Sequence, residues 1–155
     1  MDPELYNTYF YVEDCSGEDG NEVVINSLST NRWGGGLISI NLEYSYDQIN
    51  WIQLPTIQPG ERRILLLPKN NRCYLRGKNI HYQHIWISAK YNHSVGGNIM
   101  SLICDSDFKE QFELKYSEFT GLFQSDTNTL IYSHNLVLPA TTLSAVCYAH
   151  MFWGY

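Results

Sequence analysis

The fold class is decided by the stretch Leu37-Ile38-Ser39-Ile40-Asn41-Leu42-Glu43-Tyr44-Ser45-Tyr46. From Ile38 onward, apolar and polar residues alternate with a period of two, which is the pattern of a strand with one buried face. Asp47-Gln48 then turns the chain, and Trp51-Ile52-Gln53-Leu54 returns as the partner strand. The sequence therefore predicts a β-hairpin at this position.

Shorter runs of strand-forming residues lie on both sides of the hairpin, separated by turn signals such as Pro59-Gly60 and Asn70-Asn71. Several strands at intervals of about 8–12 residues are typical of a β-sandwich or a small barrel. We therefore predict a mainly β module, a β-sandwich or small barrel, over residues 1–96. Its further strands are predicted at Tyr6–Val12, Val23–Ile25, Ile64–Leu67, Cys73–Leu75 and Ile85–Ile87.

The pattern changes after Gly96-Gly97, and residues 97–155 are predicted to form a second, α/β segment. Ile99–Ile103 is a last apolar run and is predicted as a strand. Tyr116, Phe119 and Phe123 then follow at i, i+3 and i+7, the spacing of one face of a short helix.

A short extended piece is predicted at Leu136–Pro139, ended by its proline. Thr141 or Thr142 can cap a following helix. On that helix Leu143, Cys147 and Met151 would form a stripe at i, i+4 and i+8, with Tyr148 and Phe152 beside it.

The two predicted helices are related in sequence. Glu118–Phe123 lines up with Cys147–Phe152 at one constant separation, with aromatic and large apolar positions in the same order. We call this separation the repeat offset; at about 29 residues it lies at the upper edge of leucine-rich-repeat lengths. Two copies alone are a weak signal, so a chance match is the alternative to a repeat.

The C-terminal segment resembles BspA-like leucine-rich repeats, in Asn135-Leu136-Val137-Leu138-Pro139-Ala140-Thr141-Thr142-Leu143, Cys147-Tyr148 and Met151-Phe152-Trp153-Gly154. Gly97–Ile103 and Phe119–Phe123 look like the lead-in unit before such repeats. The hairpin, with Pro59-Gly60 and Leu75-Arg76-Gly77, looks like the β-module at their N-terminus, although this part of the match is looser. Such repeats occur in surface proteins of gut Bacteroidetes and in structural proteins of their phages.

The sequence departs from this family pattern at both ends. Repeats of the family continue after the Met-Phe-x-Gly element with Cys-Thr-Ser-Leu, whereas this sequence stops at Tyr155. Many members are exported, whereas Met1–Leu5 has neither the basic nor the apolar region of a secretory signal. A virion protein is made in the cytosol and released by lysis. It would therefore combine a surface-type composition with the lack of an export signal.

A candidate interface follows from the shortness of the predicted repeat. A repeat unit cannot bury its apolar face alone, and about three units are usually needed. The apolar stripe must therefore pack on the β-module, on another copy or on further residues, because monomers rarely expose such a patch. The candidate interface residues are Leu143, Cys147, Met151, Phe152 and Trp153.

Composition excludes several other classes of function. The formal net charge is -6, and Lys and Arg are scattered, so nucleic acid is not an expected partner. No apolar run approaches the ~20 residues of a membrane span, so no membrane insertion is expected. The four cysteines, Cys15, Cys73, Cys104 and Cys147, form no C-x-x-C pair and are interpreted as reduced, buried thiols of a chain folded in the cytosol.

Several small constellations raise the question of catalysis or ligand binding. His81 and His84 would face opposite sides of a strand, with no third metal ligand nearby. Asp105 and Asp107 could hold a hard cation, but Asp-Ser-Asp is more typical of a solvated turn. The glycines of Trp33-Gly34-Gly35-Gly36 lack the Lys and Ser/Thr of a phosphate-binding loop. We therefore expect no enzyme activity, cofactor or metal.

Aromatic side chains leave one further alternative, which is stacking against sugar rings. Trp51 and Trp86 sit in alternating patterns that would bury one face, which favours core packing instead. The leading expectation is a non-enzymatic phage virion protein, a head or tail fibre or decoration protein, that forms a homo-oligomer and binds other capsid or tail proteins. The alternative is a bacterial cell-surface adhesin that binds a host-surface glycan or protein.

Overall fold

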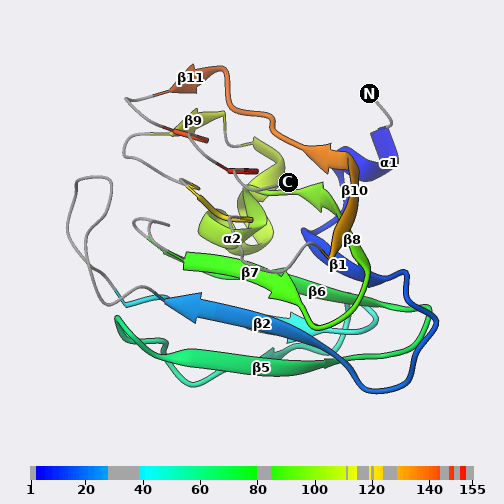
Figure 1. Cartoon of the computed structure of the whole chain (residues 1–155). Coiled ribbons are helices and arrows are strands. Elements are labelled where there is room, and N and C mark those ends of the chain that lie inside the picture. Colours follow the sequence, from blue (N-terminus) through cyan, green and yellow to red (C-terminus); the bar gives the residue numbers. More distant parts are fainter. Residues whose placement is uncertain are drawn as a thin grey trace.

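The structure is a computed structural model of the whole chain, and it is mainly β, as predicted (Figure 1). It describes residues 3–27, 39–79, 85–110, 112–114, 119, 121–123, 129–143, 147–148 and 151–152. The elements are α1 (Pro3–Tyr6), β1 (Tyr11–Asp14), β2 (Asn21–Ser27), β3 (Glu43–Ser45), β4 (Ile52–Gln53), β5 (Arg62–Leu67), β6 (Arg72–Arg76), β7 (Ile85–Ala89), β8 (His93–Asn98), α2 (Ser101–Cys104), the 3-10 helix η1 (Asp105–Glu110), β9 (Glu113–Leu114), β10 (Leu130–Val137) and β11 (Thr142–Leu143).

The strands form three open sheets. The largest has six strands in the order β10-β8-β1-β6-β3-β4, a second has the order β5-β2-β7, and the third pairs β11 with β9. In Figure 1 β5 and β2 lie at the bottom, β9 and β11 at the top, and β8 and β10 between them. The described strands do not close into a barrel, because each sheet ends in two different edge strands.

Alternating strands build the core between these sheets. In β2, Val23 and Ile25 are fully buried while the residues between them are half-exposed. The predicted hairpin is confirmed, since β3 pairs antiparallel with β4 and Tyr44 lies opposite Ile52. The buried apolar side chains form one cluster that includes both the β-module and Met151 near the C-terminus.

A close backbone approach joins the N-terminal segment to β8. Gly97 has φ +76°, and a Cβ at this position would collide with the carbonyl oxygen of Tyr9. Tyr9 forms a parallel bridge with Asn98 one residue further on. Only glycine fits both the left-handed backbone and the space at this crossing.

The C-terminal part consists of two successive coils that lie side by side. We define coil 1 as residues 93–123, with β8 and β9, and coil 2 as residues 130–152, with β10 and β11. β10 runs parallel to β8 with Val137 opposite Asn98, and β11 runs parallel to β9 with Leu143 opposite Leu114. The connection from β8 to β9 in coil 1 is longer than the connection from β10 to β11 in coil 2. The difference equals the combined length of α2 and η1.

Four predicted elements differ from the structure. The strand predicted at Ile99–Ile103 is replaced by α2, and the strand predicted from Tyr6 begins only at Tyr11. The two predicted helices are absent from the described residues. Phe119 and Tyr148 have φ of 62° and 59°, which no right-handed helix tolerates, and Thr142–Leu143 is strand. Spacing alone cannot distinguish a helix face from a turn that presents the same aromatic residues.

The predicted boundary between residues 96 and 97 falls inside β8. β10, which belongs to the predicted C-terminal segment, is a strand of the six-stranded sheet. The two predicted parts therefore share a sheet.

Candidate protein interface on the outer coil

Aromatic rings stack between the two coils at positions separated by the repeat offset. Phe119 stacks on Tyr148 with ring centroids 6.0 Å apart and planes within 8°. Phe123 stacks on Phe152 at 5.3 Å and 24°. Each such pair contributes about 0.5–1.5 kcal/mol beyond its buried area. The residues that align in the sequence therefore also meet in space.

Backbone hydrogen bonds hold the same register. The amide of Phe123 donates to the carbonyl oxygen of Met151 at 2.9 Å, and the amide of Thr141 donates to that of Phe112 at 2.8 Å. Together with the β9–β11 pairing, these bonds fix the described residues of coil 2 from Thr141 onward on coil 1, whereas β10 pairs with β8 at a larger separation of 37 to 39 residues. Phe112 and Thr141, like Leu114 and Leu143, are separated by the repeat offset, which is therefore a spatial register as well.

Coil 2 carries a concentration of exposed apolar side chains. Of the eleven exposed large hydrophobic residues among the described ones, five lie in coil 2. We call these five residues together the outer face; they come from β10, from β11 and from the segments that follow these strands: Ile131, Tyr132, Leu138, Leu143 and Phe152. No described strand pairs with the outer edge of β10 or β11. A surface of this kind is suited to a protein partner.

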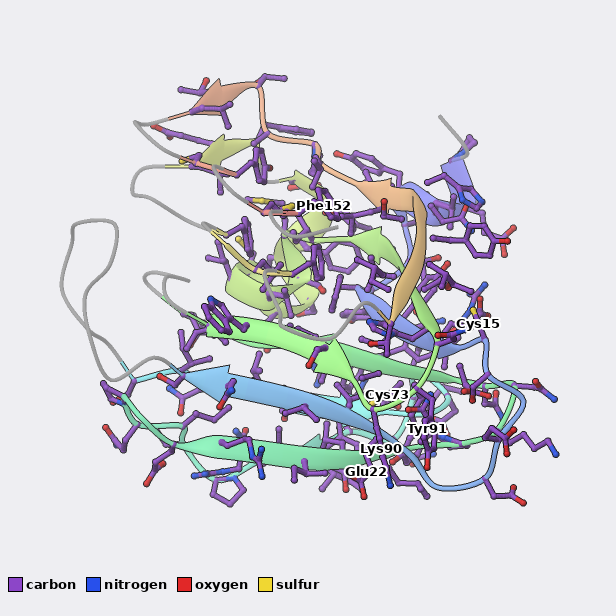
Figure 2. All side chains as sticks on the ribbon, in the orientation of Figure 1. Cys15, Glu22, Cys73, Lys90, Tyr91 and Phe152 are labelled. Carbon is purple, nitrogen blue, oxygen red and sulfur yellow. The ribbon has the colours of Figure 1, made fainter. Side chains whose placement is uncertain are left out.

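The candidate interface residues fall into different environments. Leu143 is 51% exposed, and Phe152 lies on the coil side of the molecule with 37% exposure (Figure 2). Cys147 is half-buried. Met151 is 3% exposed and belongs to the core, so it supports the fold rather than offering a surface. Trp153 lies outside the described residues.

Sequence reasoning missed Ile131, Tyr132 and Leu138, although a signal was present. The sequence from Thr127 to Tyr155 contains no Asp, Glu, Lys or Arg, while the whole chain has 10 basic and 16 acidic residues. A long stretch that is partly exposed and yet contains no charged residue is typical of the centre of a protein interface.

A cluster of polar side chains surrounds Arg76 of β6 in the β-module. Its Nε donates to Glu43 Oε2 at 2.7 Å and lies 2.9 Å from Asp105 Oδ1. Its guanidinium also stacks over the Trp51 ring, 4.1 Å from the centroid. Burial alone would lower the pKa of Arg76, but the bond to Glu43 and the charge of Asp105 outweigh burial and raise the pKa.

This Arg76 cluster borders a depression of about 280 Å³, lined by Asn41, Leu42, Glu43, Gln53, Gly77, Lys78 and Asp105. A neighbouring depression of about 470 Å³ continues past Asp105 to Asp107. Glu43 and Asp105 are both already paired with the Arg76 guanidinium. This arrangement indicates a structural role for the cluster rather than ligand recognition.

The other predicted constellations have different outcomes. Asp105 and Asp107 lie in η1 rather than in an extended turn. Among the described residues, no group of three or more His, Cys, Asp or Glu is placed to hold a metal ion. His81, His84 and the Trp33–Gly36 stretch lie outside the described residues. Among the described helices, none is both long and apolar enough to cross a membrane.

The four cysteines are free thiols in the structure. Cys15 is exposed, which departs from the prediction of a buried thiol, and Cys15 and Cys73 lie well apart in Figure 2. Burial raises the pKa of Cys73 to about 12. Burial, together with the charge of Asp107, raises the pKa of Cys104 to about 11. Neither of these two thiols is activated as a nucleophile.

Trp51 and Trp86 are the residues for which stacking against sugar rings was the alternative to core packing. Trp51 contacts both the Arg76 guanidinium and the Tyr9 ring, whose centroid is 4.8 Å from its own. Trp86 is half-exposed on β7. The most exposed aromatic ring described is Tyr132, which contacts His134 edge-on at 5.7 Å in β10.

Comparison of the chain with protein-family models, with curated proteins and with solved structures finds no significant match. Its function is therefore inferred from the outer face and from the sequence patterns.

Proposed function

We propose that the chain is a non-enzymatic structural protein of a Bacteroidetes-type phage virion, a head or tail fibre or a decoration protein. In this proposal residues 1–96 form a β-sandwich that anchors to the particle, and residues 97–155 form a leucine-rich-repeat-like segment. The protein acts by protein–protein anchoring and takes part in host-surface attachment. Its location is the virion.

The observation that carries this proposal is the contact of Phe112, Leu114, Phe119 and Phe123 with the residues one repeat offset later, together with the exposed apolar residues of the uncharged coil 2. Stacked coils extend a chain in one direction and present surfaces for lateral or end contacts. The resemblance to BspA-like repeats in phage structural proteins supports the same assignment.

Mass spectrometry of purified phage particles tests the proposal. Particles made from the genome that encodes this chain are banded in a density gradient, and their peptides are quantified against a host cytosolic protein as the contamination control. We expect this chain to be enriched with the capsid and tail proteins. Enrichment no greater than that of the cytosolic control would overturn the proposal.

The alternative is a bacterial cell-surface adhesin or glycan-binding module. It is favoured by one observation, the exposed Tyr132 ring on the edge strand β10, because exposed aromatic rings stack on sugars. Limited proteolysis of intact host cells distinguishes the two assignments. Release of peptides from this chain by uninfected cells would support the adhesin and contradict the virion protein.

A further inference from the structure

We propose that one side of the six-stranded sheet binds a neutral saccharide, which stacks on the Tyr132 ring and hydrogen-bonds to the Glu13–Arg72 pair. The inference rests on the host-surface attachment that forms part of the proposed function, and it names the chemical class of the molecule bound there.

Strand pairing places the residues of this site in one row across four neighbouring strands. Tyr132 of β10 is the register partner of Ser94 in β8, and Ser94 is the register partner of Glu13 in β1. Glu13 in turn lies opposite Arg72 of β6. Neighbouring strands lie about 4.8 Å apart, so the backbones of Tyr132 and Glu13 are about 10 Å apart. Between them the row contains only the small side chain of Ser94. We call these four residues the polar row.

Tyr132 reaches this side of the sheet because β10 is irregular. Leu130, two positions earlier, lies opposite the buried His93 and packs against the core. In a regular strand Tyr132 would point in the same direction as Leu130. The register shift between Leu130 and Tyr132 turns the ring to the other side of the sheet, where it is 57% exposed. Such a shift also hinders a peptide from adding to the edge of β10 as a further strand.

The Glu13–Arg72 pair is held in a fixed arrangement. Arg72 Nε donates to Glu13 Oε1 at 2.8 Å, and the guanidinium lies over the Tyr11 ring, 4.0 Å from its centroid. The Ser94 hydroxyl donates to Glu13 Oε2 across a long 3.4 Å, so this oxygen can still accept a stronger hydrogen bond. The side chains of Arg72 and Glu13 are 35% and 32% exposed, and a ligand can therefore reach both.

These features together favour a neutral saccharide. The apolar side of a sugar ring packs on an exposed aromatic ring, while its hydroxyl groups donate to a carboxylate and accept from a guanidinium. The charges of Glu13 and Arg72 cancel, and an anionic sugar would meet the Glu13 carboxylate without an unpaired cation in the polar row. The Arg76 cluster has no aromatic ring as exposed as Tyr132, since its guanidinium lies over Trp51.

A glycan array tests the inference. The full chain, at about 100 µM, is applied to immobilised neutral oligosaccharides and to acidic ones that carry uronic or sialic acids. We expect binding to members of the neutral set. For the strongest of these, Tyr132→Ala should raise the dissociation constant about 10-fold, whereas Tyr132→Phe keeps the ring and should stay within about threefold.

Ile131→Ala is the matched control, because Ile131 is the neighbour of Tyr132 on β10 and is 41% exposed. It should leave the dissociation constant unchanged within about twofold. Glu13→Gln removes the charge that strengthens the hydrogen bonds to the sugar and should raise the constant about 10-fold.

Nuclear magnetic resonance of the unmodified chain locates the site without any variant. On addition of the strongest neutral oligosaccharide of the array, the amide signals of Tyr132, Ser94 and Glu13 should shift most. Shifts centred on Trp51 or Trp86 instead would overturn the inference. So would binding to acidic saccharides alone, binding to none, or equal weakening by Tyr132→Ala and Ile131→Ala. A chain that binds no saccharide but is enriched in purified virions would leave the proposed virion assignment standing.

Discussion

Two buried polar residues, Asp14 and His93, lie opposite each other where β1 pairs with β8. The Asp14 carboxylate accepts hydrogen bonds from Ser16, Asn21 and the amide of Asn70, and so ties together two turns. Burial would raise the pKa of Asp14, but these hydrogen bonds outweigh burial and lower it to about 2. At His93, burial lowers the pKa to about 4, so the imidazole is neutral in the folded protein near pH 7.

The stability of the fold should therefore depend on pH through His93. The pKa of His93 is about 4 in the folded protein, and its ordinary value is 6.5. Between pH 4 and pH 6.5 the imidazole is therefore protonated mainly in the unfolded chain. The contribution of the neutral His93 to the free energy of unfolding is complete above pH 6.5 and is lost as the pH falls toward 4. Between pH 7 and pH 5 we expect the free energy of unfolding to fall by about 2 kcal/mol more in the native chain than in His93→Gln. Equal pH dependence of the two chains in urea titrations would contradict this.

Two glycines in left-handed conformations should respond differently to a methyl group. Gly97 has φ +76° and faces the Tyr9 carbonyl, whereas Gly20 has φ +79° and no atom within 4 Å of the added Cβ. Gly20→Ala should cost about 1 kcal/mol of unfolding free energy through backbone strain alone. Gly97→Ala should cost roughly 3 kcal/mol because strain and collision combine. Equal losses in thermal unfolding would show that the Tyr9 crossing is unimportant.

At the scale of elements, the two coils pair residues that are distant in sequence. The strand signals of β2, β5, β6 and β7 are local, because period-two alternation and turn residues act within a few positions, and those predictions were confirmed. The parallel pairing of β9 with β11 depends instead on contacts across the repeat offset, such as that between Leu114 and Leu143. Periodicity detects the spacing of these aromatic residues but not the backbone geometry that presents them, so the turn of Phe119 and Phe123 was predicted as a helix.

The outer face was only partly predictable for the same reason. Leu143 and Phe152 were identified because an isolated repeat must leave apolar residues uncovered, and both are exposed. Met151 was placed with them by helical spacing, but a turn directs it into the core. Tyr132 could not be found from periodicity because it lies on β10, whose place at the edge of the sheet is set by contacts distant in sequence, and Leu138 follows this strand directly.

The ring stack between the coils should be measurable as a coupling energy. A double-mutant cycle of Phe123→Leu and Phe152→Leu should give about 1 kcal/mol, because the two rings lie 5.3 Å apart. Phe108→Leu is a suitable control partner for Phe152→Leu, since Phe108 packs on Tyr9 instead. That control cycle should be additive within about 0.5 kcal/mol. Additivity in the Phe123–Phe152 cycle would mean that the stack adds nothing beyond buried area.

At the scale of the whole molecule, the coils and the β-module are connected through shared backbone pairing. β10 of coil 2 and β8 of coil 1 are strands of the six-stranded sheet. On the other side, the amide of Ile87 in β7 donates to the carbonyl oxygen of Leu122 at 2.7 Å. The hydroxyl of Thr129 also donates to the carbonyl oxygen of Ala89 at 2.9 Å. The C-terminal part is therefore attached to both larger sheets.

We expect the two parts to unfold together. In native-state hydrogen exchange with increasing denaturant, amides of β10 and of β1 should exchange with the same free energy, that of global unfolding. The short β11, with two residues and one neighbour, should open at lower free energy. Exchange in β10 that is easier than in β1 by more than about 2 kcal/mol would show that coil 2 unfolds independently.

The uncharged stretch from Thr127 to Tyr155 also means that coil 2 is attached to the rest of the molecule without an Asp, Glu, Lys or Arg of its own. Its attachment rests on strand pairing, backbone hydrogen bonds and ring contacts such as that of Phe152 on Phe123. Added salt screens ion pairs, with a Debye length of about 8 Å near 0.15 M, but has little effect on contacts of this kind. The attachment of coil 2 should therefore hardly depend on ionic strength, unlike that of a segment held by ion pairs.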